Sequence, residues 1–209
     1  MGSRVEEPVE TRHVGQRHLD RLVMLSDGVF AIAITLSAIE IKPETASGQT
    51  LWQVWSTPLS VYFLSFFLIG VMWAGHRRIV GHLRDIDAVG TAINLLLLSL
   101  VALTPVVIRF VFAGASQNQA MLIYAIALTV TFTCMAALWG YVAFIANLAP
   151  DLALRVRRAW LMNMVGAPML TGALVLHQLN NRWGTLALTL LGVALLVGKR
   201  VVMHRKRPD

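Results

Sequence analysis

Charged residues are scarce in this chain. Asp, Glu, Lys and Arg make up 14% of its 209 residues, whereas apolar residues make up 56%. The mean hydropathy is +0.65. This balance excludes an ordinary soluble domain, in which about a quarter of the residues are charged. The apolar residues stand in long blocks without the polar face of a surface-bound helix. The composition therefore predicts an all-α protein that spans the membrane.

Cysteine and the signatures of catalysis are also lacking. The single cysteine, Cys134, excludes an intrachain disulfide and a zinc cluster. The sequence has no Gly-rich phosphate loop, no nucleophile with His and carboxylate at a recognisable spacing, and no group of metal ligands. We therefore expect no catalytic residues, no metal site and no cofactor, and we predict that the protein is not an enzyme.

Six uncharged windows are long enough to predict transmembrane helices. A short polar turn at 114–119 divides one uncharged block that is too long for a single helix. The predicted organisation is an N-terminal tail at 1–20, a transmembrane domain at 21–203 and a basic tail at 204–209. The six segments are placed at about 22–42, 57–76, 88–108, 119–147, 159–180 and 183–203.

Basic residues collect in alternate connections. They lie in both tails, in the second-to-third loop and in the fourth-to-fifth loop. The positive-inside rule then places both termini in the cytoplasm of a multi-pass cell-membrane protein. Topology and attraction to anionic lipid account for the net charge of +7, so lipids are the expected partner and nucleic acid is not. An N-terminal signal peptide is the alternative, and Asp27-Gly28 at the start of the apolar run argues against it.

An acid interrupts the first apolar segment. The uncharged run between Asp27 and Glu40 is 12 residues long, or about 18 Å of helix, against a hydrocarbon layer of about 30 Å. If this segment spans the membrane, Asp27 lies at membrane depth. Ionisable residues are costly there unless they face protein or water, so Asp27 is a candidate functional residue.

The first three segments carry recognisable motifs. Arg21, three intervening residues and Leu25-Ser26-Asp27 resemble the Arg-x-x-x-Phe-Ser-Asp first-helix signature of prokaryotic relatives of the lysosomal potassium channel, transmembrane protein 175. Leu25 stands where the signature has Phe. The likeness covers roughly residues 20–110. Its further motifs are Phe63 to Gly70, Trp73, His76-Arg77-Arg78, Asn94 to Leu98 and Leu103-Thr104-Pro105.

The resemblance implies a tetrameric, non-voltage-gated cation channel that prefers potassium and has its pore lined by the first helix. K⁺ would be the permeant ion, and the chain's partner would be itself in a homotetramer. The usual Thr-Val-Gly-Tyr-Gly filter is absent, so selectivity would not come from a ring of backbone carbonyls. By family resemblance, the hydrophobic constriction falls at Ile32, Leu36 and Ile39.

Helix geometry gives a separate view of these positions. At about 100° per residue, Ile32, Thr35, Leu36 and Ile39 share one face, with Gly28 and Arg21 in line toward the cytoplasm. Asp27 lies about 140° from Ile32 and should point to neighbouring helices. Four copies of the aliphatic stripe would gate by dewetting, and Thr35 would supply a polar ring for selectivity. The alternative interpretation is that this stripe is ordinary helix-packing surface.

Several polar residues could brace the first helix against its neighbours. Asn94 stands in an apolar run, where an unpaired amide would be costly. His76 follows Trp73 by three residues, so the two share a helix face. An ordinary interfacial role is the alternative for His76. The proposed bracing network comprises Arg21, Ser26, Asp27, Trp73, His76 and Asn94.

A secondary transporter is the competing function. One intramembrane acid, Asp27, could bind a proton or sodium and couple it to alternating access. The sequence shows neither an inverted repeat nor a pair of helices broken by Gly or Pro, which favours the channel.

Overall fold

The computed structural model describes residues 9–39, 48, 50–112 and 117–204. Every regular element among them is helical, as predicted. The elements are α1 (Val9–Ile39), α2 (Leu51–Val80), α3 (Ala88–Phe112), α4 (Gln117–Gly140), a π-helical turn η1 (Tyr141–Ile145), α5 (Leu154–Gln178) and α6 (Arg182–His204).

Five stretches are long and apolar enough to cross a membrane. They are Gly15–Ile39, Leu51–Val80, Ala88–Phe110, Gln119–Ile145 and Leu154–Gln178. The apolar part of α6, Arg182–Gly198, is shorter. The helices therefore agree with the prediction of a multi-pass membrane protein, with the sixth segment weaker than the other five.

The first helix starts well before the predicted residue 22. The segment 1–20 was predicted as a tail, but the chain is helical from Val9. Packing explains this extension, because Leu19 is buried against the bundle core and His18 Nε2 lies 3.4 Å from Thr91 Oγ1 on α3. A Cβ added to Gly15 would stand 2.7 Å from the Asp85 carboxylate. The predicted end of this segment, residues 40–42, lies outside the described residues.

The second helix also starts earlier than predicted, at Leu51 instead of 57. Thr50 and Gln53 form a capping box in which the Thr50 N–H donates to Gln53 Oε1 at 2.9 Å and Thr50 Oγ1 accepts from the Gln53 N–H at 3.4 Å. This cap satisfies N–H groups that have no partner within the helix. Pro58 then lies inside α2.

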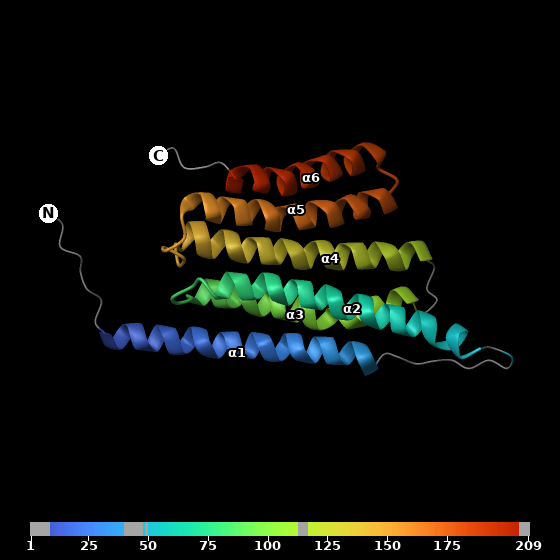
Figure 1. The fold of residues 1–209 in the computed structure, drawn as a ribbon, viewed down its shortest axis with the longest axis horizontal. Coiled ribbons are helices and arrows are strands. Elements are labelled where there is room, and N and C mark those ends of the chain that lie inside the picture. Colours follow the sequence, from blue (N-terminus) through green and yellow to red (C-terminus); the bar gives the residue numbers. More distant parts are fainter. Residues whose placement is uncertain (1–8, 40–47, 49, 113–116, 205–209) are drawn as a thin grey trace.

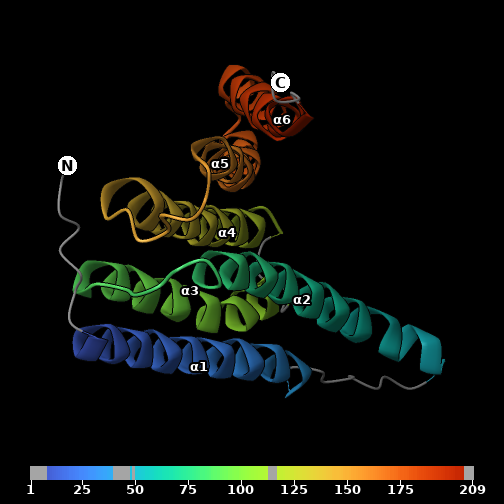
Figure 2. The same cartoon turned by 60° about the vertical axis from the view of Figure 1, so that its left-hand side comes forward.

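The helices run up and down in a row and do not close into a ring (Figures 1 and 2). The helices α1, α2 and α3 pack against one another, α4 packs on α3, α5 on α4, and α6 on α5. Because α1 and α6 lie at opposite edges, one face of α1 is left uncovered within the single chain.

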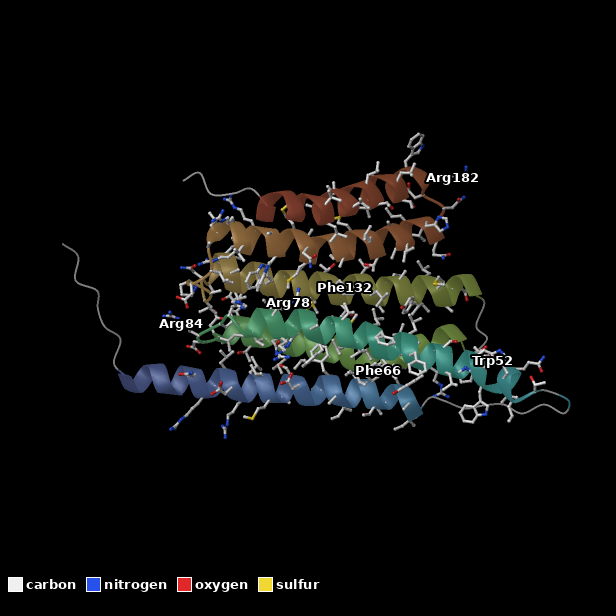
Figure 3. All side chains as sticks on the ribbon, in the orientation of Figure 1. Trp52, Phe66, Arg78, Arg84, Phe132 and Arg182 are labelled. Atoms are coloured by element: carbon white, nitrogen blue, oxygen red, sulfur yellow. The ribbon has the colours of Figure 1, made fainter. Side chains whose placement is uncertain are left out.

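Two connections meet at one end of the bundle. Arg84, before α3, donates two hydrogen bonds to the carboxylate of Asp151, before α5, at 2.9 and 2.7 Å. The hydroxyl of Tyr141 in η1 bonds to Asp87. Arg84 lies at this end, and Trp52 and Arg182 lie at the other (Figure 3). The two Arg-rich connections thus share one end, as the charge pattern predicts.

Candidate functional site: the two faces of the first helix

The two sides of α1 have different surroundings. One side packs into the bundle, and its buried residues are Leu19, Leu22, Ser26, Phe30, Ala33 and Ser37. These positions recur every three or four residues and so form a single face. The opposite side is exposed in the single chain. The helix therefore presents one face to its own bundle and another to whatever surrounds the chain.

Three polar side chains form a chain of hydrogen bonds on the buried face. Ser26 Oγ donates to Leu22 O at 2.7 Å, and Asn94 Nδ2 donates to Ser26 Oγ at 3.1 Å. His76 Nε2 lies 2.7 Å from Asn94 Oδ1. Each residue is at most 1% exposed, so these bonds satisfy groups that neither lipid nor water can reach.

The directions of these bonds follow from the Ser26 hydroxyl. Because its single hydrogen is donated to Leu22 O, its oxygen can only accept from Asn94. The amide of Asn94 must then turn Nδ2 to Ser26 and Oδ1 to His76. The remaining bond requires a hydrogen on His76 Nε2. The network consequently has one consistent arrangement, which joins α1, α2 and α3.

A second link joins α1 directly to α2. Trp73 Nε1 donates to Asp27 Oδ1 at 2.8 Å. Above the same indole, the Arg77 guanidinium carbon lies 5.4 Å from the ring centre, within the range of a cation–π contact. Asp27 is thus directed to a neighbouring helix, and its charge is accompanied by an indole donor and a nearby cation.

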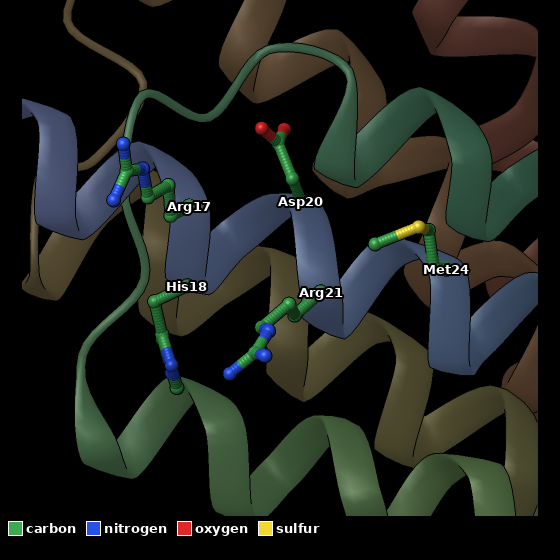
Figure 4. A pocket seen from close by; sticks show the side chains of 5 residues that line it. All are labelled: Arg17, His18, Asp20, Arg21 and Met24. Carbon is green, nitrogen blue, oxygen red and sulfur yellow. The ribbon is translucent and has the colours of Figure 1, made fainter.

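Arg21 lies away from the other five residues of the predicted bracing network. It makes no hydrogen bond to any of them. On the helical wheel it stands about 140° from Ser26. Its side chain is exposed and borders an open pocket of about 580 Å³ (Figure 4). This pocket is lined by Arg17, His18, Asp20, Arg21 and Met24.

The aliphatic stripe lies on the uncovered side of α1. Ile32 is 59% exposed, Leu36 40% and Ile39 68%. Thr35 is exposed among them, and its hydroxyl donates to Ile32 O at 2.9 Å. A Cβ added to Gly28, on the same side, would have no atom within 4 Å. Packing within the chain therefore does not explain the stripe.

Phe30 is a member of the site that the sequence analysis did not single out. Its side chain is 1% exposed, and its ring centre lies 5.4 Å from that of His76. Phe30 follows Ser26 by four residues, which places both on one helix face. That spacing was the available signal. The aromatic ring packs against the imidazole at a tilted angle.

Comparison with known proteins points to the same three helices. Residues 21–105 match the family model described as endosomal/lysosomal potassium channel TMEM175. A protein of Streptomyces collinus named as a potassium channel is 31% identical over 130 residues, covering 58% of this chain and 63% of the relative. Another so named, from Chamaesiphon minutus, is 39% identical over 97 residues, covering 43% and 47% of the respective chains.

Vertebrate relatives match over a smaller share of their length. The Gallus gallus protein named endosomal/lysosomal proton channel TMEM175 is 28% identical over 90 residues, covering 41% of this chain and 18% of its own. The aligned regions span about half to just under two thirds of the bacterial relatives' lengths. No solved structure gives a significant match. The matched region includes every residue predicted for the bracing network, and over this region the chain is similar to the TMEM175 family.

Proposed function

We propose that the protein is a potassium-preferring cation channel in the cell membrane, with both termini cytoplasmic. Four copies surround a pore lined by the exposed face of α1. Ile32, Leu36 and Ile39 form a hydrophobic constriction, and Thr35 forms a polar ring within it. K⁺ passes passively, without a bound cofactor. The match to the family model supports a channel, since the similar proteins of Streptomyces collinus and Gallus gallus are named as channels.

The exposed stripe of α1 is the observation that carries this proposal. The other side of the helix is fixed to α2 and α3 by Ser26–Asn94 and Asp27–Trp73. The stripe is consequently held facing outward on a braced helix. Copies of the chain arranged around an axis would bring these stripes together, as closed rotational symmetry requires. Narrow rings of aliphatic side chains exclude bulk water and so gate conduction.

Thr35 is suited to the polar ring because its donor is already in use. The hydroxyl hydrogen points to Ile32 O in the same helix. The oxygen keeps a lone pair for a cation. Four such oxygens would replace part of the hydration shell of an ion beside the apolar constriction.

Liposome flux measurements with purified protein test the proposal. Wild-type protein should dissipate a potassium gradient passively, and Ile32→Asn should increase the flux because a polar ring is easily wetted. Lowering the barrier by about 1.4 kcal/mol would raise the flux about tenfold. Ile126→Asn is the matched control, because Ile126 is an exposed isoleucine on α4 and the change should leave flux unaltered.

Other outcomes would favour other functions. Slow, saturable flux that requires a coupled sodium or proton gradient would indicate a transporter that uses Asp27. Proton current without potassium current would match the name of the vertebrate relatives and contradict the potassium preference. If Ile32→Asn and Ile126→Asn behaved alike, α1 would not line the pathway.

A further inference from the structure

The pore-facing stripe of α1 continues toward the N-terminal end of the helix into charged residues. The helix is unbroken from Val9 to Ile39. Arg17 precedes Thr35 by 18 residues, and Arg21 precedes Ile39 by the same number. Eighteen residues make about five full turns, so each arginine lies on nearly the same angle as its partner, about 27 Å away along the axis. Any axis that Thr35 and Ile39 face is therefore faced by Arg17 and Arg21 as well.

Both arginines are available to act on the entrance. They are exposed and line the same open pocket (Figure 4). Arg17 and Arg21 are not involved in the bracing contacts of α1, which leave from Ser26 and Asp27. By the positive-inside rule, the end of the bundle that holds these arginines is cytoplasmic.

From this geometry we propose that Arg17 and Arg21 form a positively charged ring at the cytoplasmic mouth and limit outward cation current. This inference rests on the proposed function. Charges lining an entrance change the local concentration of permeant ions. A cation that moves outward must enter the pore through this positive region. A cation that moves inward reaches the ring only after it has crossed the pore. Outward current is consequently reduced more than inward current.

Other charges near the ring set its net sign. Asp20 lines the same pocket and lies on the flank of the stripe that faces α2, where it also borders a groove with Asp27, Arg77 and Arg84. Its carboxylate offsets one of the two guanidinium charges. His18 is directed to Thr91 on α3. The ring thus keeps about one net positive charge per copy, and removing Asp20 should strengthen its effect.

Current recordings from excised inside-out patches that contain the full chain test the ring. The measured quantity is the ratio of outward to inward potassium current at equal and opposite voltages. At about 10 mM symmetrical KCl the Debye length is about 30 Å, and at about 1 M it is about 3 Å. Wild-type protein should give a ratio below one at low salt that approaches one at high salt.

Charge variants should move that ratio in opposite directions. The double variant Arg17→Gln, Arg21→Gln should raise it about two- to tenfold at low salt, and Asp20→Asn should lower it. Arg158→Gln is the matched control, since Arg158 is exposed on α5, at the same end of the bundle but beyond α3 and α4. The Arg158→Gln variant should give the same ratio of outward to inward current as the wild type.

The results separate failure of the ring from failure of the channel. Potassium current with a ratio that is independent of salt, or unchanged in both Asp20→Asn and the double variant, would overturn the ring and leave the channel standing. Absence of any cation current from wild-type protein would refute the proposed function itself. If the double variant fails to assemble, the opposite shift expected for Asp20→Asn still decides the question.

Discussion

The two ends of the helix row are held together by different interactions. The helices α1, α2 and α3 are joined by buried side-chain hydrogen bonds through Ser26, Asn94 and His76. Where α5 meets α6, glycines set the packing. A Cβ on Gly166 would stand 3.0 Å from the Leu196 side chain, and one on Gly192 would stand 3.0 Å from that of Leu170.

The two ends thus associate their helices in two different ways, both of which work within lipid. Lipid tails are as apolar as leucine, so helices in a membrane gain little from the hydrophobic effect and associate through close packing or polar contacts. Packing on glycines holds two helices near each other. A directional network also fixes the rotation of a helix about its axis. Rotation matters for α1, because it decides which face meets the proposed pathway.

Breaking the network should produce the largest effect. Asn94→Leu leaves the buried Nε2–H of His76 without its acceptor, and an unsatisfied buried group costs about 1–3 kcal/mol. Unfolding of the purified protein in mixed detergent should show that loss, and potassium flux should fall as α1 loses its orientation.

Ser65→Ala is the control for Asn94→Leu. The Ser65 side chain is 2% exposed, and its hydroxyl donates to Val61 O in its own helix at 2.8 Å. Its removal leaves the hydrogen bonds that join α1, α2 and α3 intact, so the cost should stay near about 0.5 kcal/mol. Equal effects of the two substitutions would mean that the network does not hold the three helices together.

At the α5–α6 end of the row, the stability of the protein should depend on side-chain size and not on polarity. A Cβ on Gly192 would meet Leu170 and Met169 atoms at 3.0–3.2 Å, whereas one on Gly172 would meet Leu188 at an ordinary 3.5 Å. Gly192→Ala should destabilise the protein by about 1 kcal/mol, the lower end of overpacking costs. Gly172→Ala should stabilise it by up to about 1 kcal/mol through helix propensity. The same unfolding assay measures both, and a shared sign would contradict the difference in packing.

Much of the first half of the bundle could be predicted from the sequence. A polar side chain within an apolar run must find a partner, and this marked Asn94 before its contacts were known. Ser26 was marked by the first-helix motif, and His76 by the helix face that it shares with Trp73. The early start of α2 was also readable, because Thr50 and Gln53 have the spacing of a capping box. The extension of α1 to Val9 depends on packing against Asp85 and Thr91, which no local pattern encodes.

The sequence does not predict what surrounds the exposed stripe of α1. Sequence periodicity marks which face of α1 is apolar. It does not distinguish lipid, a second copy of the chain or a dewetted lumen, since all three accept aliphatic side chains. For Arg21, by contrast, periodicity does decide the face. Its position in the motif suggested a role with Ser26 and Asp27, but the helical angle already placed it in line with Gly28 and Ile39.

Substitution of Gly28 tests what the stripe faces, and its expected effect on stability is the smallest of these predictions. Its added Cβ would meet nothing within the chain, so Gly28→Ala should stabilise the single subunit by up to about 1 kcal/mol through helix propensity. Gly70→Ala on α2, where an added Cβ also meets nothing, is the matched control. If Gly28 faces the lumen, both variants should gain stability and assemble normally, and only Gly28→Ala should alter potassium current. If it faces lipid, neither current should change. Weaker assembly of Gly28→Ala alone would show that another copy packs directly against this position, and the constriction would then have to lie elsewhere on the helix.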